Sequence, residues 1–153
     1  MDIEYFTSNR EMQYAKACYT FAKKLGLIDD DSFNAVKTRC DAENKAREEK
    51  IKNGEIVYGV TNFSLPAYIR YELTRFKLDF VSQAEKIKNN YNYKEISHDE
   101  EKEFFESNAD LFTRYNGDSF SFGEVEAVIR KRIREAEYDN EIKNILCQCA
   151  DRQ

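Results

Sequence analysis

Turn-forming residues are scarce in this sequence. Its 153 residues include only five Gly and one Pro, and Trp is absent. An all-β fold needs many Gly- and Pro-containing turns between short strands, so this scarcity argues against one. The hydrophobic fraction of 41% suffices for one core, and the charged fraction of 35% indicates a heavily charged surface. We therefore expect a single all-α domain over residues 1–153.

Charge of one sign and long apolar runs are also lacking. The net charge of −5 is mild and acidic, whereas nucleic-acid-binding proteins usually carry a basic excess. No apolar run approaches the roughly 20 residues that cross a bilayer. The start, Met1–Tyr5, has neither the basic nor the apolar region of a signal peptide. The sequence thus predicts a cytoplasmic protein that binds neither nucleic acid nor membrane; the alternative is an exported protein whose signal has been removed.

Few residues offer metal or nucleophile chemistry. The cysteines Cys18, Cys40, Cys147 and Cys149 lack the C-x-x-C spacing of zinc and redox sites. We interpret them as reduced thiols, the first two packing on helix faces. The single histidine, His98, lies in the first turn of a predicted helix, and no catalytic or metal-binding set can be built around it. We expect no metal, no cofactor and no catalytic residue.

Charged residues fall mostly in pairs of opposite sign. Glu43/Arg47 and Glu48/Lys52 are four residues apart, the spacing of ion pairs on a helix surface. The one basic cluster, residues 130–134, is followed by acidic residues, so we interpret it as a solvated helix face. The alternative is a site for an acidic or phosphate-bearing ligand.

Capping patterns and apolar stripes predict about five helices. Ser8, Ser97 and Ser121 each precede a glutamate by three residues, as in a capping box. The first three helices are expected at about 8–25, 32–53 and 65–89, with residues 56–60 as an extended connector, a short helix from 97 and a last helix from 122. They form a long N-terminal hairpin, a central apolar helix and a C-terminal helix that packs back. Residues 41–52 are polar almost all round, which predicts a helix half that projects or lines a groove.

Tyrosine is abundant, with ten Tyr beside eleven Phe. A tyrosine offers a large contact area at low entropic cost together with a polar tip, which suits a surface that accepts apolar peptide. One group of aromatic residues gathers around the connector and the central helix, and the alternative for it is burial in the core. The predicted peptide-binding residues are Tyr58, Phe63, Tyr68, Tyr71, Tyr91 and Tyr93.

Several of these segments resemble the helical chaperone module of the SurA-type peptidyl-prolyl isomerase family. Glu43–Arg47, the connector with Tyr58-Gly59, and Tyr68–Tyr71 look like that family's long helix, connector and second helix. Ile96–Phe112 is similar to the segment before the family's isomerase domain, and Phe120–Val125 looks like the segment after it.

Only a short turn, residues 113–119, lies where the isomerase domain would be. The resemblance therefore implies a chaperone-like polypeptide-binding module without isomerase activity. Its partners would be unfolded or extended polypeptide, or a partner protein. One alternative is an enzyme that acts on a peptide or small molecule in a pocket of the same scaffold, and another is a subunit whose exposed helix completes a homodimer. An open apolar groove favours binding, whereas an enclosed pocket with convergent polar groups favours catalysis.

Overall fold

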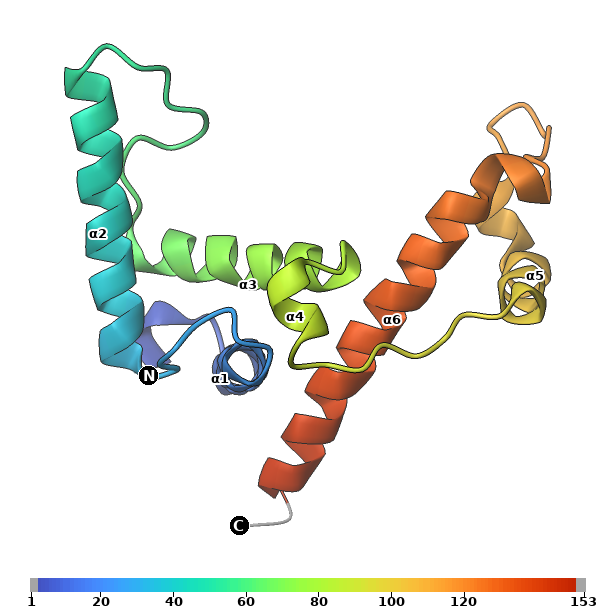
Figure 1. The fold of residues 1–153 in the computed structure, drawn as a ribbon, viewed down its shortest axis with the longest axis horizontal. Coiled ribbons are helices and arrows are strands. Elements are labelled where there is room, and N and C mark those ends of the chain that lie inside the picture. The colour runs from blue at the N-terminus through green and yellow to red at the C-terminus, as the bar shows by residue number, and fades with distance from the viewer. Residues whose placement is uncertain (1–2, 151–153) are drawn as a thin grey trace.

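A computed structural model describes residues 3–150 and confirms the all-α prediction (Figure 1). Within that range the elements follow in this order: the 3-10 helix η1 (Ile3–Tyr5), α1 (Asn9–Lys24), α2 (Phe33–Lys52), α3 (Leu65–Val81), α4 (Glu85–Lys88), α5 (His98–Ser107), the 3-10 helix η2 (Ala109–Phe112) and α6 (Phe122–Ala150). The described part contains no strand, only an isolated bridge between Thr113 and Ser119. None of its helices is long and apolar enough to cross a membrane.

All three predicted capping sequences begin helices, although only one forms the full reciprocal pair. Before α5, the Ser97 hydroxyl accepts from the Glu100 N–H while the Ser97 N–H donates to the Glu100 carboxylate. Before α1, Ser8 accepts from the Glu11 N–H, but the Glu11 carboxylate turns to the preceding threonine instead. Before α6, the glutamate carboxylate accepts from both the N–H and the hydroxyl of Ser121. Each arrangement satisfies part of the unpaired N–H set at a helix start.

The prediction of one central helix to about residue 89 was wrong. α3 ends at Val81, and Gln83 takes a left-handed conformation with φ 54° that breaks the helix before α4. In a continuous helix Ile87 would lie about 10 Å beyond Phe80 along the axis. The break folds the chain back so that both side chains are fully buried in the same cluster. The turn that buries Ile87 contains neither Gly nor Pro, so the sequence around it does not indicate a helix break.

The main core forms where α1, α3 and α6 meet, and its buried residues are Ala17, Cys18, Phe21, Leu25, Phe80, Ile87, Tyr138 and Ile142. A second cluster joins α1, α2 and α3 through Tyr19, Ala22, Val36, Cys40, Tyr68, Ile69 and Phe76. A third lies where α5, η2 and α6 meet and contains Phe112, Val125 and Ile129. Cys18 and Cys40 are buried free thiols, which confirms their predicted packing role.

A buried polar group ties the first three helices together. Glu72 of α3 is buried and accepts from the Tyr19 hydroxyl of α1 at 2.9 Å. Its carboxylate also accepts from Arg39 of α2 through two bonds, at 2.7 and 3.1 Å. A buried charge that is fully paired in this way fixes the mutual placement of the elements that carry it.

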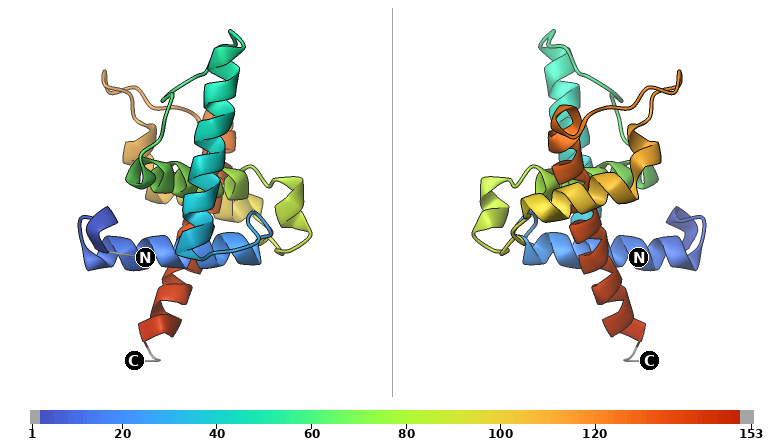
Figure 2. Two further views of the ribbon diagram at one scale, coloured as in Figure 1. Left: turned by 90° about the vertical axis from the view of Figure 1, so that its left-hand side faces the viewer. Right: turned by 90° about the vertical axis from the view of Figure 1, so that its right-hand side faces the viewer.

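The helices leave the core in different directions. α2 follows α1 after a short loop, as in the predicted hairpin, but lies across α1 rather than along it (Figure 2). Only Val36 and Cys40 of α2 are buried, so residues 41–52 stand clear of the core, as their polarity predicted. α6 packs back on α1 and α3, which confirms its predicted position.

Candidate functional site

The second half of α2 and the segment that returns along it form a projecting arm, defined here as residues 41–63 (Figures 1 and 2). The chain reverses at Gly54, whose φ of 74° is readily accessible only to glycine. Residues 55–62 have no helix or strand, in agreement with the predicted connector, although Gly59 bends it with a positive φ of 81°. The arm then joins α3 through Phe63, where the backbone meets the core again.

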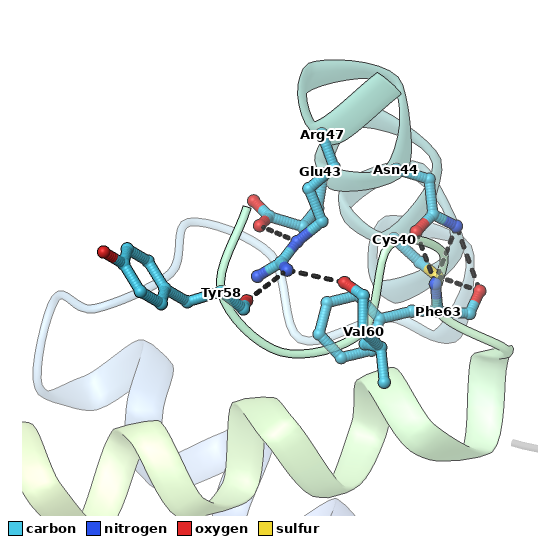
Figure 3. Close-up of polar contacts among 7 residues, drawn as sticks. All are labelled: Cys40, Glu43, Asn44, Arg47, Tyr58, Val60 and Phe63. Atoms are coloured by element: carbon cyan, nitrogen blue, oxygen red, sulfur yellow. Dashed lines mark hydrogen bonds and ion pairs between the residues drawn. The ribbon is translucent and has the colours of Figure 1, made fainter. Parts of the chain in front are cut away.

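Asn44 clamps the base of the returning segment. Its side-chain amide donates to the Phe63 carbonyl at 3.0 Å and accepts from the Phe63 N–H at 2.7 Å (Figure 3). The Cys40 thiol lies 3.9 Å from the same carbonyl oxygen. One side chain thereby satisfies both backbone groups of a residue, as a neighbouring strand would.

Arg47 holds the middle of the segment. Its guanidinium donates to the carbonyls of Tyr58 at 3.1 Å and Val60 at 2.7 Å, while its Nε donates to Glu43 at 2.8 Å (Figure 3). It also lies 4.7 Å from the centroid of the Phe63 ring. The Arg47 side chain is consequently only 14% exposed, although its helix half projects. Because these charge-assisted bonds to two carbonyls come from a side chain of α2, the helix holds the returning segment in its conformation.

Four apolar side chains of the arm are exposed to solvent. Ile56 is 76% exposed, Tyr58 83% and Val60 49%, and Ile51 on α2 is exposed as well. Among the described residues, no backbone N–H from 56 to 62 donates a hydrogen bond. Exposed apolar side chains on a backbone that Asn44 and Arg47 already hold make this segment a candidate protein-binding surface.

The six predicted aromatic residues fall into two groups. Phe63, Tyr68 and Tyr71 pack together at the foot of the arm, with ring centroids 5.1 to 6.0 Å apart. Burial, followed by the Glu72 carboxylate, raises the pKa of Tyr68 above its ordinary value, and Tyr71 keeps an exposed edge. Tyr68 is therefore part of the second cluster, Phe63 and Tyr71 cover it from outside, and Tyr58 lies apart from all three on the returning segment.

Tyr91 and Tyr93 belong to the second group, which the structure does not bring to the arm. Both rings pack on Phe80, with centroids 5.0 and 4.8 Å away. The Tyr93 hydroxyl donates to the Phe80 carbonyl at 2.6 Å, and burial raises the pKa of Tyr93 to about 12. Tyr91 and Tyr93 therefore cover the main core next to the end of α3.

Glu137 is a buried carboxylate beside an open groove of about 380 Å³ between α5 and α6. One of its oxygens accepts from the Tyr91 hydroxyl and the Lys94 N–H, and the other accepts from Arg134. Protein donors occupy both oxygens, so this carboxylate is not presented to a substrate. The groove gives no support to the enzyme alternative.

The basic cluster at 130–134 is mostly neutralised. Its three arginines pair with acidic residues, giving the pairs Arg130–Glu101, Arg132–Glu135 and Arg134–Glu137. The surface pairs Glu43/Arg47 and Glu48/Lys52 form as predicted. This pairing agrees with a helix face that balances its own charge.

Fold and site together define a helical module with a projecting arm, in which polar side chains of α2 hold a segment that exposes apolar side chains. No protein-family model matches the chain. A chaperone for lacto-N-biosidase from Bifidobacterium longum subsp. longum is 36% identical over 67 residues, which cover 44% of this chain and 24% of that protein.

The fold also resembles solved structures. GH136 lacto-N-biosidase from Eubacterium ramulus matches 89% of this chain with a TM-score of 0.75 and 25% identity in its native form. Its selenomethionine derivative gives a TM-score of 0.74 and 26% identity. The matched regions make up only 28% and 27% of those chains, so this chain spans about a quarter of each protein that it matches.

These similarities contradict the predicted resemblance to the SurA-type isomerase family. They point instead to lacto-N-biosidases and to a chaperone for one of them. The segments that suggested the isomerase family are helix caps, apolar spacings and a connector, which helices packed in the same way share whatever their ancestry. The relative from Bifidobacterium is itself named a chaperone, in agreement with the chaperone-like role predicted from sequence.

Proposed function

We propose that this chain is a chaperone-like accessory module that binds a glycoside hydrolase of the lacto-N-biosidase class and promotes its folding. The observation that carries the proposal is the fold match: nearly all of this chain corresponds to about a quarter of a lacto-N-biosidase chain. In that enzyme, the matched region belongs to the same chain as the rest of the protein. A separate protein with this fold could bind the rest of such an enzyme in the same way. The name of the Bifidobacterium relative supports the same function.

The arm is the surface that we assign to the partner. Hot spots in protein interfaces are enriched in large side chains that insert into pockets, with tyrosine prominent among them. Tyr58 and Ile56 are highly exposed on the arm, while Asn44 and Arg47 hold the backbone of the same segment. A backbone ordered in advance lowers the entropic cost of association.

Co-production tests the proposal. A lacto-N-biosidase that is served by the Bifidobacterium chaperone is produced alone, with that chaperone, and with this chain, and its soluble activity is measured. We expect this chain to raise soluble activity and to co-purify with the enzyme. An unchanged yield together with the absence of a complex, while the Bifidobacterium chaperone is effective, would contradict the proposal.

Two substitutions separate the arm from general chaperone behaviour. Tyr58→Asp places a charge on the exposed arm, and Tyr115→Asp places the same charge on an exposed tyrosine in the 113–119 turn at the other end of the molecule. We expect the first to reduce the effect on the enzyme and the second to leave it unchanged.

A further inference from the structure

Three metal-binding side chains meet where α5 packs on α6. His98 and Glu101 lie three residues apart, and therefore on one face of α5, and Glu126 lies near the start of α6. One ligand atom from each lies within 4.8 Å of the other two. The His98 Nδ1 is 3.5 Å from the Glu101 Oε2. No such set around His98 is recognisable in the sequence, because Glu126 is distant in the chain and only the fold brings it near.

Glu101 supplies an independent sign of a missing ligand. Its side chain is 1% exposed, and its Oε1 accepts from Arg130. Its Oε2 is also buried yet has no hydrogen-bond donor within the described part of the chain. A buried carboxylate oxygen that accepts no hydrogen bond is unfavourable unless a cation reaches it, and the His98 Nδ1 is 3.5 Å away. This oxygen faces the imidazole of His98, so a bound cation would satisfy it.

The surroundings suit a cation that enters from solvent. The His98 side chain is 59% exposed, and Glu126 is half-buried, so one side of the cluster is open for water ligands. The edge-to-face contact between the His98 and Phe122 rings, with centroids 5.3 Å apart, restricts the imidazole. Arg130 offsets one of the two carboxylate charges, which leaves a net charge of −1 to attract a dication.

We propose that His98, Glu101 and Glu126 bind one transition-metal dication of the zinc class. An imidazole with two carboxylates is a donor set for such ions, whereas calcium and magnesium favour oxygen ligands alone. The ion would link α5 to α6 and stabilise the third apolar cluster beneath them. This inference is independent of the proposed function.

Metal titration of the full chain tests the proposal. Exposed Cys147 and Cys149 are first replaced by serine, because their thiols would otherwise supply a second zinc site. The metal-free protein is titrated with Zn²⁺ by calorimetry, and with Co²⁺ to record its visible ligand-field bands. We expect one equivalent to bind, and a concentration of 100 times the dissociation constant to raise the unfolding temperature by about 5–10 °C.

Variants locate the ion. His98→Gln and Glu126→Gln should each weaken binding at least about 10-fold and shift or abolish the Co²⁺ bands. Glu103→Gln, an exposed residue of the same helix, should change neither. Glu101 is left intact because its loss would also disturb the pairing with Arg130. Absence of saturable binding, or binding that is unaltered by both His98→Gln and Glu126→Gln, would overturn the proposal.

Discussion

The described residues outside the arm, 3–40 and 64–150, form the body of the molecule. Tyr138 and Tyr58 show how differently the body and the arm use the same residue type. In the body, Tyr138 is 1% exposed and packs against Phe21 and Phe80. On the arm, Tyr58 is 83% exposed, and only its backbone carbonyl is held. The body thus buries its aromatic rings against one another, whereas the arm uses polar side chains to fix a backbone that presents its apolar groups outward.

This contrast separates stability from recognition. Residues of the body should affect unfolding strongly, and the exposed apolar residues of the arm should affect partner binding with little change in unfolding. Asn44 and Arg47, which hold the backbone of the arm, should have an intermediate effect on unfolding. Substitutions in the three places can therefore be ranked by their effect on the free energy of unfolding.

The largest effect is expected at Phe80. This fully buried ring contacts four other aromatic rings of the main core. Phe80→Ala should lower the free energy of unfolding by about 3–5 kcal/mol, since it removes apolar contact and leaves a cavity. Denaturant titration measures this; a loss below about 1 kcal/mol would show that the main core does not dominate stability.

Glu72 should have the next largest effect. Glu72→Ala leaves the buried Tyr19 hydroxyl without its acceptor and removes both bonds from Arg39 to the carboxylate, so that Arg39 keeps only its bond to the Asp30 carbonyl. We expect a loss of about 2–3 kcal/mol, less than for a fully buried pair because Arg39 retains access to solvent. The double variant Arg39→Met/Glu72→Met should recover part of this loss by apolar packing. No recovery would mean that the charges themselves hold the three helices in place.

A smaller effect is expected from Asn44→Ala. The substitution removes both hydrogen bonds to Phe63 but leaves the body intact. The free energy of unfolding should fall by about 1 kcal/mol, and amide hydrogen exchange at Phe63 should accelerate more than exchange in α6. Equal acceleration throughout the chain would contradict the separation of arm from body.

The smallest effect on stability is expected at Tyr58, on the returning segment of the arm. Tyr58→Asp should change the free energy of unfolding by less than about 0.5 kcal/mol, because the side chain has almost no contacts to lose. Thermal and denaturant unfolding measure this directly. A loss above 1 kcal/mol would place Tyr58 in the packing of the module.

Local signals in the sequence were sufficient for most helices. Serine caps and apolar stripes gave the starts of α1, α2, α5 and α6 within a residue or two, and the polarity of residues 41–52 indicated the projecting half of α2. The end of α3 was missed because Gln83 adopts its left-handed conformation to satisfy packing, without a residue type that marks it.

The site was only partly predictable. Tyr58, Phe63, Tyr68 and Tyr71 were expected together and lie at the arm or its foot, whereas Tyr91 and Tyr93 join the main core through contacts distant in sequence. The framework residues Asn44 and Arg47 were not foreseen as such. Their signal is a stripe of polar residues at spacing three to four on a solvated helix, which becomes informative only once its partners in the returning segment are known.

The affinity of the arm for its partner tests the central claim most directly. The chain, its Ile56→Asp/Tyr58→Asp variant and its Tyr115→Asp variant are titrated against the same lacto-N-biosidase by calorimetry, after unfolding curves confirm equal stability. We predict that the arm variant loses at least about 30-fold in affinity, as expected for interface hot spots, while Tyr115→Asp binds like the unmodified chain. Equal affinity of all three proteins would contradict the assignment of the arm as the docking surface.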